Sequence, residues 1–143
     1  MDQNAVVNEQ TESGKRLIET LATAGFDVPI AFWAKPTDDG KWFLYLASSI
    51  VDEKGPAVAY RSVQEVLRRI PNLWIDLLEV KVIGLKDSLT QAALAVMKPT
   101  VADGPFAVRH TKPYPGMTRF DGTVLGGVSI DGAYFYPQSQ PVA

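Results

Sequence analysis

The stretch from Pro29 to Ser49 constrains the fold of this chain more than any other part of the sequence. It holds five aromatic residues in two apolar runs, and the segment Thr37-Asp38-Asp39-Gly40 separates the two runs. Apolar, aromatic-rich runs on either side of such a turn are typical of paired β-strands. The sequence therefore predicts a β-hairpin over this stretch.

Both predicted strands are apolar on both faces. Phe32 and Trp33 are neighbours in the first strand, and Trp42 and Phe43 are neighbours at the start of the second. Neighbouring side chains of a strand point to opposite faces, whereas a half-solvated hairpin alternates apolar and polar residues. We therefore expect the sheet to be covered on both sides, by helices of the same chain, by a partner, or by both.

Apolar residues at helical spacing predict helices in three places. These are about Glu12 to Ala24, Pro56 to about Ile70, and Asp87 or Ser88 to Met97. Gly25 suits the position after the first helix, because glycine adopts a left-handed conformation without a Cβ clash. Pro71 ends the second helix, since proline cannot donate the backbone hydrogen bond that would continue it.

Three further strands are predicted. Trp74 to Gly84 alternates Leu78, Val80 and Val82 with charged residues, which indicates a strand with one solvated face. Val124 to Ile130 and Ala133 to Tyr136 flank Asp131-Gly132, a dipeptide that favours a two-residue hairpin turn. The charged segment between Ser49 and the second helix is predicted to be a turn.

These elements predict an α+β fold. We expect a single domain over residues 11–143, with a mixed, mostly antiparallel sheet of about five or six strands and about three helices, in the order αββαβαβββ. Residues 1–10 are polar and are expected to form a disordered tail, and residues 99–122 form a loop rich in proline and glycine.

Composition excludes several classes of function. The formal charge of −2 rules out a globally basic nucleic-acid binder, and the lack of cysteine rules out disulfides and thiolate chemistry. A single histidine without a spaced acidic cluster predicts no metal site, and no cofactor motif is present. No segment approaches the ~20 apolar residues of a membrane span, so we expect a soluble, cytoplasmic protein.

Residues 107–122 concentrate positive charge beside aromatic rings. The candidate ligand-binding residues there are Arg109, His110, Lys112, Tyr114 and Arg119. This composition is typical of sites for anionic ligands or single-stranded nucleic acid. The alternative is a solvated loop whose cations offset acidic groups elsewhere, because three permanent cations are few beside the roughly six to ten phosphate contacts of dedicated DNA binders.

Ser48 and Ser49 form a second candidate ligand-binding site. They lie where a predicted strand ends shortly before a helix, the position at which open α/β sheets bind ligands, although serine is also a common turn former. A hydrolase or isomerase could use these serines or His110. The segment from Gly127 to Asp131 matches a nucleophile elbow only in part, because it lacks the final glycine.

The sequence therefore leaves three functional hypotheses. The leading one is a non-enzymatic interaction module that forms a homo-oligomer or binds a protein partner through aromatic surface of the sheet, including Tyr134, Phe135 and Tyr136. The second is a binder of an anionic ligand or nucleic acid through residues 107–122. The third is a small hydrolase or isomerase.

Overall fold

A computed structural model describes residues 8–71, 73, 75–97, 118–120 and 122–136 of this chain. The elements, in chain order, are α1 (Asn8–Thr23), β1 (Ile30–Pro36), β2 (Phe43–Ala47), α2 (Ser49–Lys54), α3 (Pro56–Arg69), the 3-10 helix η1 (Leu77–Glu79), β3 (Val80–Ile83), α4 (Ser88–Met97), β4 (Thr118–Phe120), β5 (Val124–Leu125) and β6 (Val128–Phe135).

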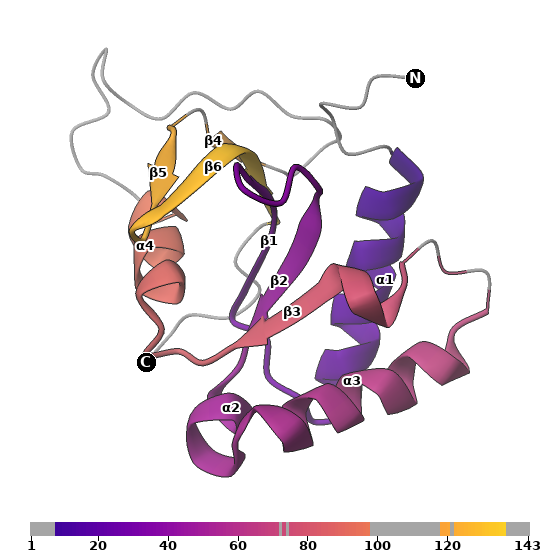
Figure 1. The fold of residues 1–143 in the computed structure, drawn as a ribbon. Helices are drawn as coiled ribbons and strands as arrows, with labels where there is room; N and C mark the ends of the chain where they lie inside the picture. Colours follow the sequence, from indigo (N-terminus) through magenta and orange to yellow (C-terminus); the bar gives the residue numbers. More distant parts are fainter. Residues whose placement is uncertain (1–7, 72, 74, 98–117, 121, 137–143) are drawn as a thin grey trace.

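The strands form one mixed sheet in the order β3-β2-β1-β6-β4, with β5 paired to β6 beside this path. The β2–β3 pair is parallel, and the other pairs are antiparallel. In Figure 1, α1 and α3 lie on one side of the sheet and α4 lies on the other. The predicted α+β class with a mostly antiparallel sheet is confirmed.

The predicted hairpin is present as β1 and β2, and both of its faces are buried. Phe32 pairs with Tyr45, and Trp33 pairs with Leu44 on the opposite face. Neither Phe32 nor Trp33 has exposed surface. We call the side of Trp33 the first face and the side of Phe32 the second face. Elements of the chain itself cover both faces of the hairpin, which is one of the alternatives expected from the sequence.

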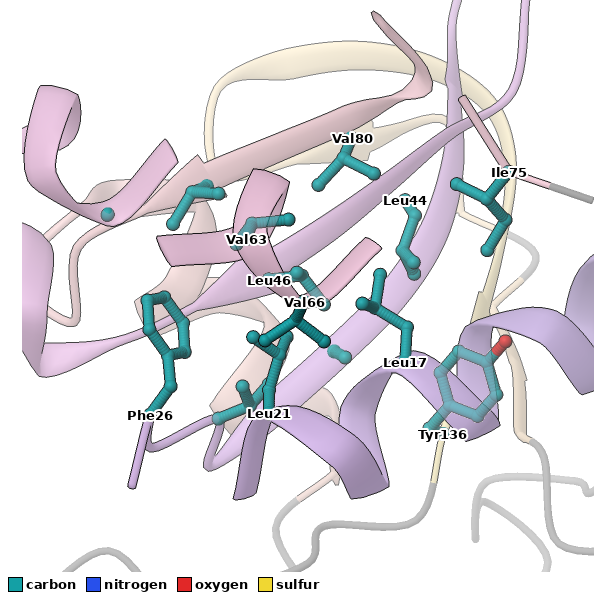
Figure 2. Close-up of a cluster of buried hydrophobic side chains, with 14 of the residues drawn as sticks. Leu17, Leu21, Phe26, Leu44, Leu46, Val63, Val66, Ile75, Val80 and Tyr136 are labelled. Carbon is teal, nitrogen blue, oxygen red and sulfur yellow. The ribbon is translucent and has the colours of Figure 1, made fainter. Parts of the chain in front are cut away.

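Two amphipathic helices cover the first face. Leu17 and Leu21 of α1 and Val63 and Val66 of α3 are buried in the same cluster as Leu44 of β2. Figure 2 shows these five side chains gathered between the helices and the strands. Both helices were predicted from their periodicity, and Gly25 follows α1 with a φ of 88° as expected.

Helix α1 packs closely against the sheet at Gly14. The Trp33 indole N–H donates to the Tyr136 hydroxyl (2.8 Å), which donates to the backbone carbonyl of Thr11 in α1 (2.7 Å). A Cβ at Gly14 would overlap the Tyr136 hydroxyl oxygen. Glycine at this position therefore allows the helix to reach a buried hydrogen-bonded network that joins it to β1 and the end of β6.

A shorter helix and a ladder of aromatic rings close the second face. Phe32 stacks on Tyr45 with ring centroids 5.1 Å apart and also contacts Phe135 at 5.1 Å. Leu89 and Ala93 of the predicted helix α4 are buried in the same cluster. The β1, β2 and β6 strands therefore share one aromatic core under α4.

The hairpin turn predicted at Asp131-Gly132 is wrong. The turn lies at Gly126-Gly127, where φ is 57° and 85°, and β6 runs on through Asp131 and Gly132 as one strand. Opposite β1, the register shifts by one residue between the Ala34–Ala133 and Pro36–Ile130 pairs, so Asp131-Gly132 form a bulge. Both dipeptides allow positive φ, and the earlier turn leaves β6 long enough to pair with β1 on one side and β4 and β5 on the other.

Two segments between the central elements differ from prediction. The expected turn after Ser49 contains the short helix α2, which Ser48 caps. The expected strand from Trp74 to Gly84 is a strand only over Val80–Ile83, because η1 precedes it. Val80 and Val82 are buried on the first face as predicted, but Leu78 lies outside the strand.

Two further expectations concern residues near the ends of the described ranges: the polar tail and the loop rich in proline and glycine. Residues 8–10, assigned to the polar tail, belong to α1. Of the loop at residues 99–122, only 118–120 and 122 lie within the described residues, and 118–120 form β4. Across the described ranges, the structure contains no helix with the length and apolar character needed to cross a membrane.

Candidate functional site

The predicted ligand-binding serines at the end of β2 bind an internal carboxylate. The buried Ser48 hydroxyl donates to Asp27 Oδ1 (3.0 Å) and accepts from the Ile50 N–H as the cap of α2 (3.2 Å). Ser49 donates from its hydroxyl to Asp27 Oδ1 (2.8 Å) and from its backbone N–H to Oδ2 (3.1 Å). Together these bonds tie the loop before β1 to the start of α2.

A second carboxylate lies at the end of the neighbouring parallel strand. Asp52 of α2 accepts the N–H of Leu85 (2.6 Å), and a Cβ at Gly84 would lie 2.5 Å from Asp52 Oδ1. Carboxyl ends of parallel strands are common ligand sites. Here Asp27 and Asp52 of the chain itself occupy both ends, so a ligand would have to displace them.

Little in the described residues supports catalysis at this edge. Ser48 and Ser49 donate to a carboxylate, and neither is within hydrogen-bond reach of a described general base other than Asp27. His110 lies outside the described residues. Nowhere in the described ranges do three or more His, Cys, Asp or Glu side chains come together as a metal site would require.

Arg119 is the described member of the basic, aromatic stretch. It lies on β4 with an exposed side chain, and its guanidinium carbon lies 5.8 Å from the ring centroid of Tyr134. Arg109, His110, Lys112 and Tyr114 lie outside the described residues. The anion-binding arrangement expected for these five residues stays a prediction.

The aromatic residues expected to offer a partner surface on the last strand belong to the core. Tyr134 and Tyr136 are buried on the first face, and Phe135 is buried on the second. Tyr134 also packs against Trp42 at 5.5 Å between ring centroids. A partner that binds the described part of the chain must therefore use another surface.

Two backbone donors at the outer edge of β3 cannot pair with a further strand. The Val82 N–H donates to the Tyr60 hydroxyl of α3 (3.0 Å), and the Val80 N–H donates to the carbonyl of Leu77. An added strand needs free N–H and C=O groups along the edge it joins. These two donors are already used inside the chain.

Leu78 is the most exposed large apolar side chain of the described residues, with 83% of its surface accessible. It projects from η1, which a capping box holds in place. The Asp76 N–H donates to Glu79 Oε1 (2.9 Å), and Asp76 Oδ1 accepts from the Leu78 N–H (3.4 Å). The chain therefore presents an exposed leucine on an ordered turn.

A depression lined by both apolar and polar residues lies between α3 and η1, where Leu77 and Glu79 flank Leu78. Its volume is about 570 Å³, and it is wide open to solvent. The described lining residues are Gln64, Leu67, Arg68, Leu73, Ile75, Asp76, Leu77 and Glu79. Ile75 also belongs to the first-face cluster and lies near Leu44 and Val80 in Figure 2, so the packed core supports the depression from behind. We call Leu78 and this depression the η1 surface.

Charges of opposite sign border the η1 surface. Arg68 lies on the α3 side, where its guanidinium is 4.0 Å from Glu65 and its side chain is 68% exposed. Asp76 and Glu79 lie on the η1 side, where each uses one carboxylate oxygen for a bond of the capping box. The α3 side therefore carries a paired cation and anion, and the η1 side carries two carboxylates.

Sequence reasoning assigned Leu78 to the inner face of a strand and so missed this surface. The signal was available, because Asp76 and Glu79 have the spacing of a capping box, which predicts a helical turn. The depression itself depends on residues up to fifteen positions apart and could not be found from local spacing.

Comparison with known proteins adds no constraint on function. No protein-family model, no curated protein and no solved structure shows a significant match to this chain.

Proposed function

We propose that this chain is a non-enzymatic interaction module that binds a protein partner through the η1 surface. The observation that supports this proposal is an exposed leucine held on an ordered turn next to an open depression. Isolated exposed leucines are common on protein surfaces and need no explanation. An ordered leucine beside a recess differs, because further leucines line that recess, at Leu67, Leu73 and Leu77.

The physical basis of the proposal is the burial of Leu78. Covering a fully exposed leucine contributes roughly 1.5–3 kcal/mol, and further apolar area in the depression adds to it. The capping box already fixes the backbone of η1, so binding does not have to order this turn. A few residues carry most of the binding energy in protein interfaces, so the loss of a single anchor can release a partner.

The test compares two exposed apolar residues. The protein is purified gently from cells that express it naturally, as wild type, Leu78→Asp and Val124→Asp, and each sample is analysed by native mass spectrometry. Val124 is 56% exposed on β5, which pairs with β6, whereas η1 directly precedes β3 at the opposite edge of the sheet. We expect a bound protein chain with wild type and Val124→Asp, and its loss with Leu78→Asp.

Two results would contradict the proposal. One is a partner that binds Leu78→Asp as well as wild type, which would place the contact elsewhere. The other is the absence of any bound chain, whether a second copy or a different protein, in all three samples. Thermal unfolding of each variant shows whether the fold is intact, so a loss of binding can be assigned to the surface.

A further inference from the structure

We draw no further inference here: the strongest candidate, the open depression between the C-terminal end of α1 and helices α2 and α3, is lined by the oppositely charged Glu65 and Arg69 as well as by Leu21, Phe26 and Ile50, and nothing in the structure shows what covers it.

Discussion

The two faces of the sheet are closed by different means. On the first face, the 16-residue α1 and the 14-residue α3 lay long apolar stripes across the strands. On the second face, the ten-residue α4 covers a ladder of rings that includes Phe32, Tyr45 and Phe135. Two long helices therefore cover one face, and a shorter helix over contacting rings of three strands covers the other.

Each face also has a glycine at a close contact that involves a helix. Gly14 of α1 lies against the Tyr136 hydroxyl on the first face. On the second face, a Cβ at Gly126 would lie 2.7 Å from Leu89 Cα and 2.8 Å from the Ser88 carbonyl oxygen, both backbone atoms of α4. A side chain can move more easily than a helix backbone. We therefore expect an added Cβ at Gly126 on the second face to destabilise the fold more than one at Gly14 on the first.

Gly126→Ala should have the largest effect on stability. The new Cβ meets α4 backbone, and alanine at a φ of 57° is strained, so we expect a loss of about 2–4 kcal/mol in the free energy of unfolding. Urea denaturation measures it. Gly127→Ala is the matched control, because Gly127 also has a positive φ but a Cβ there meets no atom within 4 Å. Equal losses in the two variants would show that contact with α4 contributes nothing.

Gly14→Ala should have a smaller effect of the same sign. Alanine normally stabilises a helix interior by roughly 1 kcal/mol relative to glycine, but here its Cβ meets the Tyr136 hydroxyl, and we expect a net loss of about 1–2 kcal/mol. In a Tyr136→Phe background the same change should cost less, because the hydroxyl is gone. A double-mutant cycle measures this coupling. Stabilisation by Gly14→Ala in the wild-type background would contradict the packing of α1 described above.

Tyr45→Phe should have the smallest effect on the free energy of unfolding, and only in alkaline solution. Burial, with smaller contributions from Asp39, Tyr60 and Asp87, raises the pKa of Tyr45 to about 12 from its usual 10.0. The unfolded chain therefore loses this proton first, and stability present below about pH 10 is lost as the pH rises toward 12. By pH 11 the loss amounts to roughly 1 kcal/mol. Tyr45→Phe should show a shallower decline between about pH 9 and pH 11, and identical slopes would contradict burial of this hydroxyl.

The sequence predicted the two faces of β1 and β2, because alternation along a strand fixes which side chains share a face. It also predicted α1, α3 and α4 from their apolar periodicity. It did not predict which of two nearby dipeptides makes the last hairpin turn. Gly126-Gly127 and Asp131-Gly132 both allow positive φ, and the choice depends on pairing of β6 with β1, which lies about a hundred residues away.

The candidate sites were less predictable than the fold. Ser48 and Ser49 were placed correctly at a strand end, but their partner Asp27 lies more than twenty positions earlier and no local pattern reveals it. Leu78 was assigned to a strand because it alternates with Val80 and Val82. The capping box of Asp76 and Glu79 overrides that alternation, since it satisfies the backbone of a helical turn.

One measurement tests the central claim that the sheet is closed on both faces while Leu78 is exposed on the η1 surface. A soluble paramagnetic agent is added to methyl-labelled protein, and the broadening of each methyl signal is recorded. The Leu78 and Val124 methyl signals should broaden, while those of Leu44 on the first face and Ile30 on the second should not. Broadening of Leu44 or Ile30 would contradict the closed faces, and an unbroadened Leu78 signal would contradict its exposure on the η1 surface.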